Sequence, residues 1–240
     1  MSYSKYSILE NHDGSCELST QNSKVIVGIS GPLEPKQRHR LPLQSAIEVI
    51  IKPSSGLGPT TREVLMQDKL ATVLQAVIVT ELYPRKLIQV NAQILESPFD
   101  EFGSMNGNTF NEITSSMIDL NSCFNSSFIS LCDASIALKS SFVSSLLAIT
   151  EENSSKLINL ANVSDLDTLR SYNFKSLHLV VLEIEENKPT NILLLDSKGD
   201  FNDDDLVKVL DAAQQNTSAE FKNIRSLFKE KLSQDFIWKK

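Results

Sequence analysis

Residues 87–96 read LIQVNAQILE, and apolar and polar residues alternate along this stretch. The apolar positions that fall on one face are Ile88, Val90, Ala92 and Ile94. A period of two predicts a β-strand with one buried side. Pro84, just before the stretch, favours an extended entry into the strand and opposes a helix there.

A long amphipathic helix is predicted downstream of this strand, after a polar loop at residues 97–111. Its apolar residues recur at steps of three and four, which is the spacing of one helix face. They are Ile113, Met117, Leu120, Phe124, Phe128 and Leu131. The serines of the segment are predicted to form its hydrophilic face: Ser115, Ser116, Ser122, Ser126, Ser127 and Ser130. A strand and a helix of this length can cover one another, so we expect this pair to form the core.

The chain before the pair predicts strands at residues 16–20, 24–30 and 46–52. Thr60 followed by Glu63 is the pattern of a capping box, and it predicts a helix that lasts until about residue 82. The inward residues of this helix are predicted to be Val64, Leu65, Leu70, Val73, Leu74 and Val77.

The second half of the chain repeats the theme of strands followed by a helix. Strands are predicted at residues 142–150, 156–160, 177–184 and 191–196. A last helix begins after Asn202, and the acidic residues 203–205 suit the positive end of its dipole. Polar residues 214–218 are a predicted break in this helix. The pattern predicts an α+β fold in one domain, residues 1–240, with an internal structural duplication.

Composition narrows the classes of function. The net charge of the 240 residues is −7, so nucleic-acid binding would depend on a local basic patch or on partners. No stretch approaches the roughly 20 apolar residues that a membrane span needs. The three cysteines are odd in number and lack metal-ligand spacing, which favours reduced thiols in a cytosolic or nuclear protein.

Direct signals of catalysis are weak. The sequence contains no glycine-rich phosphate loop and no pair of histidines at metal spacing, so no cofactor and no metal site is predicted. Asp165 and Asp167 could hold magnesium beside a phosphate, although a turn or a helix start explains them better. The basic residues that could meet a phosphate backbone are Lys36, Arg38, Arg40, Arg62, Arg85 and Lys86.

Five stretches, in this order, resemble the RNase PH family: residues 13–15 with 31–35, residues 61–63, 83–96, 131–138 and 193–201. The resemblance spans nearly the whole chain. It implies the ribosomal protein S5 domain 2-like fold, with two β/α halves. This agrees with the duplication predicted from the patterns.

Active members of that family use inorganic phosphate to cleave the terminal phosphodiester at the 3′ end of RNA. The nearest counterpart of their Gly-Gly-Thr-Arg phosphate clamp is residues 107–110, where Phe110 replaces the arginine. Their paired aspartates correspond to Arg170 or Ser171 and to Ser176 or Leu177, which cannot bind magnesium as carboxylates do. An arginine of the first long helix falls near residues 68–69, which are Asp and Lys. The resemblance therefore implies a member without catalytic residues.

What the resemblance implies is a non-catalytic structural and RNA-channel subunit of the RNA exosome core, in the nucleus, nucleolus and cytoplasm. Its partners would be other RNase PH-like exosome ring subunits, cap subunits and the RNA in the channel, with no membrane. One alternative is an active phosphate-dependent 3′–5′ exoribonuclease that releases nucleoside diphosphates and uses Asp165 and Asp167. Another is a protein-binding module that kept the fold and left RNA metabolism.

Overall fold

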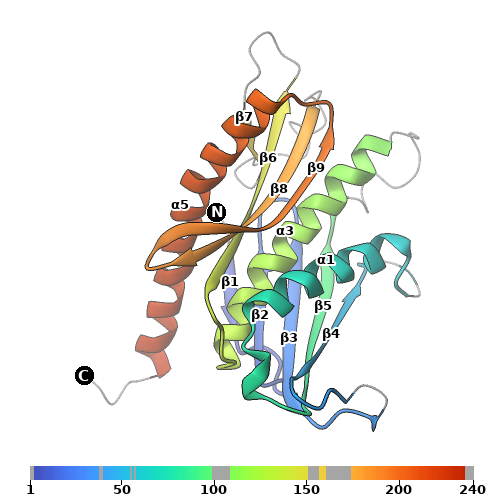
Figure 1. Cartoon of the computed structure of the whole chain (residues 1–240), viewed down its shortest axis with the longest axis vertical. Coiled ribbons are helices and arrows are strands. Elements are labelled where there is room, and N and C mark those ends of the chain that lie inside the picture. Colours follow the sequence, from blue (N-terminus) through green and yellow to red (C-terminus); the bar gives the residue numbers. More distant parts are fainter. Residues whose placement is uncertain are drawn as a thin grey trace.

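A computed structural model describes residues 3–37, 40–54, 56, 58–98, 109–150, 157–160 and 174–235. Its first sheet has the strand order β1-β2-β3-β5-β4 (Figure 1). The strands are β1 (Tyr3–Tyr6), β2 (Gly14–Ser19), β3 (Lys24–Leu33), β4 (Ala46–Lys52) and β5 (Leu87–Glu96). β4 runs parallel to β5, and the other neighbours are antiparallel. The alternation predicted for β5 is confirmed, because all four residues of its apolar face are buried.

The helix that follows β4 is α1 (Thr61–Val77), and a short 3₁₀ turn, η2 (Thr80–Leu82), comes after it. The predicted capping box is present, since the Glu63 carboxylate accepts the backbone N–H of Thr60 at 2.7 Å. The predicted phase of the buried stripe is wrong at its start: Val64 is 44% and Leu65 53% exposed, while Met66 is buried. Glu63 and Met66 begin the inward face, and the adjacent Arg62 bonds to the neighbouring helix.

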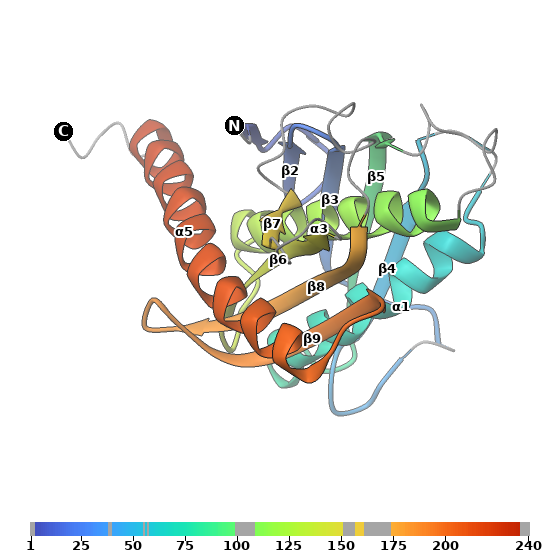
Figure 2. The same ribbon diagram turned by 90° about the horizontal axis from the view of Figure 1, so that it is seen from above.

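That neighbouring helix is α3 (Thr109–Asp133), and its predicted apolar stripe is largely confirmed from Met117 to Leu131. The prediction of a hydrophilic serine face is wrong, because Ser115, Ser122, Ser126, Ser127 and Ser130 are all buried. α3 lies between two sheets (Figure 2), so its second face is also covered. Serine is small enough for this close approach, and its hydroxyl bonds to backbone carbonyls: Ser126 donates to Cys16 and Ser130 to Val27.

The second sheet has the order β7-β6-β8-β9 with antiparallel neighbours. Its strands are β6 (Ser141–Thr150), β7 (Leu157–Asn159), β8 (Phe174–Glu185) and β9 (Lys188–Gly199). β8 and β9 form a hairpin whose two turn residues, Glu186 and Asn187, have φ of 49° and 68°. Positive φ at both positions is the geometry of a type I′ turn, whose twist matches that of the strands.

The last helix, α5 (Asp203–Asp235), covers the outer face of the second sheet (Figure 2). The predicted break at residues 214–218 is wrong, since the helix is continuous. Thr217 is fully buried there, so this polar residue packs inward on the helix face instead of ending the helix. With 33 residues α5 is about 50 Å long. Its far end reaches the first sheet, where Phe228 packs on Tyr6 with ring centroids 5.4 Å apart.

The layers thus follow the order first sheet, α1 with α3, second sheet, α5 (Figure 2). The larger apolar cluster joins the inner faces of both sheets to α1 and α3. A smaller cluster lies between the second sheet and α5; it contains Leu147, Ile149, Val180, Leu182, Val209 and Ala213. The predicted α+β class is confirmed.

Candidate functional site

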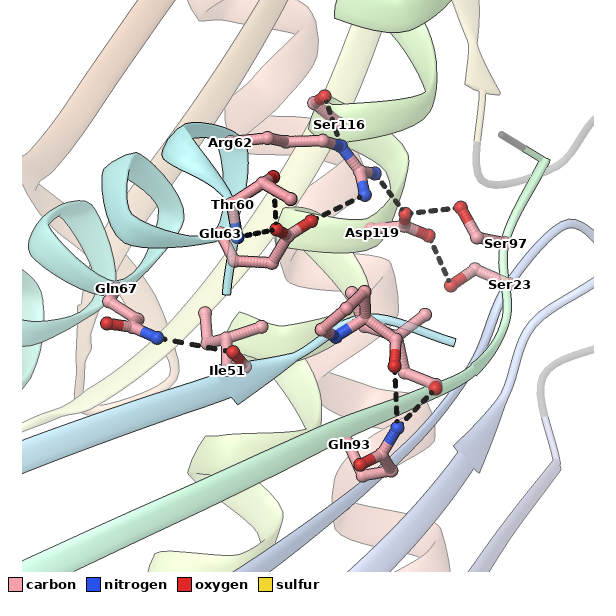
Figure 3. A network of polar contacts seen from close by, with 12 residues as sticks. Ser23, Ile51, Thr60, Arg62, Glu63, Gln67, Gln93, Ser97, Ser116 and Asp119 are labelled. Carbon is pink, nitrogen blue, oxygen red and sulfur yellow. Dashed lines mark hydrogen bonds and ion pairs between the residues drawn. The ribbon is translucent and has the colours of Figure 1, made fainter. Parts of the chain in front are cut away.

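A buried polar cluster joins the first turn of α1 to the middle of α3 (Figure 3). The Arg62 guanidinium donates through Nη2 to Asp119 Oδ2 at 2.5 Å and through Nε to the Ser116 hydroxyl at 2.7 Å. Asp119 is fully buried, and Arg62 has only 13% of its side chain exposed. Two more hydroxyls donate to the same carboxylate: Ser97 at 2.5 Å and Ser23 at 3.0 Å.

A second carboxylate, that of Glu63, touches the same guanidinium. Its Oε1 lies 3.2 Å from Arg62 Nη1, and its other oxygen accepts the N–H and the hydroxyl of Thr60. Burial acts to raise the pKa of Glu63, but the Thr60 bonds and the Arg62 charge outweigh it and hold that pKa below its ordinary value. Burial raises the pKa of Asp119, and the Arg62 charge and the serine hydroxyls act against this rise. The positive charge of Arg62 is therefore shared by two acidic groups of the chain itself.

The position expected for the second family aspartate is Ser176 or Leu177. Leu177 is fully buried in the larger apolar cluster, where it faces the layer of α1 and α3. Ser176 points the other way and bonds His178 Nε2 at 2.9 Å, while His178 Nδ1 bonds the Ser197 hydroxyl at 2.8 Å. Burial lowers the pKa of His178, which favours the neutral ring. Neither candidate position offers an oxygen to a metal ion in the space between the sheets.

Lys69, near the place expected for the arginine of the first long helix, is also engaged. Its Nζ lies 2.5 Å from Asp196 Oδ2 on β9, and 23% of its side chain is exposed. The ion pair ties α1 to the edge of the second sheet. It neutralises a cation that could otherwise attract a phosphate.

Sheet topology gathers four of the predicted RNA-contacting residues at one end of the first sheet. Leu87 pairs with Leu33 on one side and with Ala46 on the other. The last residue of β3 and the first residues of β4 and β5 therefore lie at the same end of the first sheet. The predicted residues in these connections are Lys36, Arg40, Arg85 and Lys86, and all four are exposed.

Arg62 is not part of this basic end. It lies beside Ser97, which follows the last residue of β5, whereas Lys86 precedes the first. The ten residues of β5 separate the two places by about 30 Å. The sequence grouped Arg62 with the other basic residues by charge alone. The signal that separates it from them is the capping box of Thr60 and Glu63, which places Arg62 in the first turn of a helix and not in a loop.

Sequence reasoning missed one exposed cation at the basic end. The backbone N–H of Lys139 donates to Val77 at the end of α1, and Thr80 just beyond bonds to Ser45 at the entry of β4. Lys139 is exposed. It lies in a connection after α3, far in sequence from the other basic residues, so no local charge pattern points to it.

Several predicted positions lie outside the described residues: Arg38, 107–108 of the clamp counterpart, Asp165, Asp167, Arg170 and Ser171. The helix α3 begins at Thr109, so the last part of the predicted loop 97–111 is helical. Within the described ranges, no helix is long and apolar enough to cross a membrane.

Comparison with known proteins agrees with this architecture. Residues 3–137 match the RNase PH family, described as the 3′ exoribonuclease family, domain 1. The chain belongs to the RNase PH family, which confirms the resemblance found in the sequence.

Among curated relatives, the exosome complex component RRP46 of Saccharomyces cerevisiae is 37% identical over 228 residues, which cover 94% of each chain. The exosome complex component rrp46 of Schizosaccharomyces pombe is 36% identical over 89 residues, which cover 37% of this chain and 39% of the relative. The crystal structure of rice (Oryza sativa) Rrp46 superposes with a TM-score of 0.72 at 18% identity, covering 95% of this chain and 94% of the other. That last likeness concerns the fold.

Proposed function

We propose that this chain is a non-catalytic subunit of the RNA exosome ring, built as one RNase PH-like domain. The relative that matches almost its whole length is named as an exosome component, and this supports the proposal. The net charge of −7 fits a ring member, in which only the face toward the RNA must be positive.

The side chains at the expected catalytic positions, above all the buried Leu177, are the observation that supports the absence of catalysis, and the engaged Arg62 adds to it. Phosphorolysis needs fixed donors for the attacking phosphate and a metal ion or acid that stabilises the leaving oxygen. Arg62 is bonded to two carboxylates of the chain, which repel a further anion. Leu177 fills one of the two places where the second metal-binding aspartate was expected, and Ser176 is bonded to His178 at the other.

The basic end is our proposed RNA-contacting surface, because exposed cations there can neutralise phosphates without giving up internal partners. It comprises Lys36, Arg40, Arg85 and Lys86, with Arg38 from the same connection as Lys36 and with the additional Lys139. We leave Arg62 out, because RNA contact would require it to release Asp119 into a buried, unpaired state.

The proposed partners are other RNase PH-like ring subunits, the cap subunits and the RNA that passes through the ring. The proposed location is the nucleus, including the nucleolus, and the cytoplasm. The rival functions are an active phosphate-dependent exoribonuclease and a protein-binding module outside RNA metabolism.

Co-purification followed by an activity assay tests the main proposal. The tagged chain should recover RNase PH-like ring proteins and cap proteins from cell extract. The purified chain, shown to be folded by circular dichroism, should release no nucleoside diphosphates from oligo-RNA with or without phosphate. A stable monomer that recovers no ring protein would sink the proposal, and phosphate-dependent release abolished by Asp165→Asn would establish the rival enzyme.

Charge reversal in the assembled complex tests the RNA surface. Arg85→Glu with Lys86→Glu should lower RNA crosslinking to this chain several-fold and reduce its salt dependence. Lys222→Glu with Lys229→Glu is the matched control, because both lysines are exposed on α5 and the charge change is the same. Equal crosslinking of the two double variants would reject the basic end as an RNA contact. Failure of the wild-type chain to crosslink to RNA, even within the assembled complex, would favour the protein-binding module.

A further inference from the structure

The donors around Asp119 form a convergent set that comes from separate parts of the fold (Figure 3). Arg62 is on α1, Ser97 follows β5, and Ser23 precedes β3. All three donate to the one carboxylate of Asp119, at 2.5, 2.5 and 3.0 Å respectively. A guanidinium and hydroxyls directed at a single pair of oxygens are the chemistry of an oxyanion-binding site.

Each donor is positioned by contacts that do not involve Asp119. Arg62 lies next to the capping-box residue Glu63, and its Nε is bonded to Ser116. Ser23 belongs to a turn in which its backbone N–H donates to the Thr20 hydroxyl and its carbonyl accepts from the same group. Ser97 comes directly after the paired strand β5. The site should therefore persist when the carboxylate is removed.

The charges around the site set which ligand it would take. Arg62 faces Asp119 and Glu63, so the cluster carries one negative charge more than positive. Without Asp119, the Arg62–Glu63 pair would be neutral, and a single negative charge could enter beside the guanidinium. A second negative charge would be repelled by Glu63, which is buried only a short distance away.

We infer that Asp119 is a resident anion, which fills an oxyanion-binding site of this chain and closes it to dissolved ligands. The ligand class of the opened site is the small oxyanion with one negative charge, and formate matches the group that truncation of Asp119 removes. This inference deepens the proposed function and rests on it, since it names the group that keeps inorganic phosphate away from Arg62.

The test is chemical rescue of Asp119→Ala by formate. Thermal unfolding of the wild type and the variant would be followed in sodium formate and in sodium chloride at equal ionic strength. At formate concentrations tenfold above its Kd, the Tm of the variant should rise by about 3–6 °C over its value in chloride. The wild type should show no such difference, because its site is filled.

Two further variants make the result specific. Asp119→Asn keeps the site filled and should not respond to formate, and Asp119→Ala combined with Arg62→Met should lose the response because the main donor is gone. A response of Asp119→Ala no larger than that of the wild type overturns the inference. If Asp119→Ala unfolds in chloride but folds in formate, the inference is supported. If it stays unfolded in both salts, the inference is overturned, because the donors then depend on the carboxylate.

The two proposals fail in different ways. Loss of the formate response, with normal assembly of the wild type into the ring, rejects the resident anion alone. Phosphate-dependent activity of the wild type rejects the proposed function, whatever the variants show.

Discussion

Asp133 holds the far end of α5 against the first half of the fold, so its charge should contribute strongly to stability. It is the last residue of α3, where a negative charge is opposed by the helix dipole. Donors from three other segments compensate: the Ser7 hydroxyl at 3.1 Å, the Ser15 N–H at 2.9 Å and the Lys231 ammonium of α5. Only 4% of the Asp133 side chain and 19% of the Lys231 side chain are exposed.

Asp133→Asn keeps the size of the side chain and removes the charge. Breaking a fully buried ion pair costs about 3–5 kcal/mol, and a hydrogen bond to a charged group contributes about 1.5–3 kcal/mol. Because water reaches Lys231 in part, we expect a loss of about 2–3 kcal/mol in the free energy of unfolding. For a chain of 240 residues this corresponds to a fall in Tm of about 4–12 °C.

The assay is urea unfolding of the wild type, Asp133→Asn, Lys231→Met and the double variant. The two single changes should be coupled by at least about 1 kcal/mol, since they remove the same contact. Lys222→Met, an exposed change on the same helix, is the control and should stay within about 0.5 kcal/mol of the wild type. Additive effects of the two single variants, or a loss below about 0.5 kcal/mol for Asp133→Asn, would refute the reasoning.

The remaining predictions concern buried groups. Leu177→Asp should lower the free energy of unfolding by about 3 kcal/mol or more, because it places a carboxylate among apolar neighbours. Thermal unfolding measures this loss. The control is Leu195→Asp on the exposed edge strand β9, which should be tolerated. Burial raises the pKa of Glu220 to about 7, so the folded chain holds this proton more tightly than the unfolded chain and stability should fall as pH rises from about 4.5 to 7. Urea unfolding at about pH 5.5 and 8 should show that the free energy of unfolding changes less with pH for Glu220→Gln than for the wild type. An equal change in the two proteins would contradict the raised pKa of Glu220. A thiol reagent at about pH 8 should modify Cys16 and Cys123 only as fast as the protein opens, because both side chains are fully buried and burial raises the pKa of each thiol. Rapid labelling of these two residues in the folded chain would contradict this prediction.

The sequence predicts those parts of the fold whose burial is one-sided. The alternation of β5 and the Thr60–Glu63 cap are readable because local pattern and tertiary contact agree. The serine face of α3 was misjudged because the first sheet covers it, where Ser126 and Ser130 bond to backbone carbonyls of β2 and β3. A polar residue in a helix carries no local sign of the sheet that packs against it. The same holds for Thr217 on α5, a polar residue that is fully buried within a continuous helix.

The sequence predicted which catalytic groups of the family are missing, but it did not predict the contacts of the polar cluster. The absence of a carboxylate at Ser176 or Leu177 could be read from the chain, whereas the pairing of Arg62 with Asp119 joins two helices and has no sequence spacing of its own. The basic end could be listed residue by residue but not separated from Arg62. Only the strand register shows which of these cations lie at the same end of the first sheet.

The contact of Tyr6 with Phe228 has a consequence for how the protein is made. During synthesis from the N-terminus, β1 cannot make this contact before α5 is made. The outer face of the second sheet, with Leu147 and Val180, also stays uncovered until α5 emerges. Joining segments so far apart in the chain is also slow, because a long loop must close before the contact rewards it. We therefore expect the nascent chain to bind chaperones until α5 has emerged, and a chain cut short before α5 to aggregate.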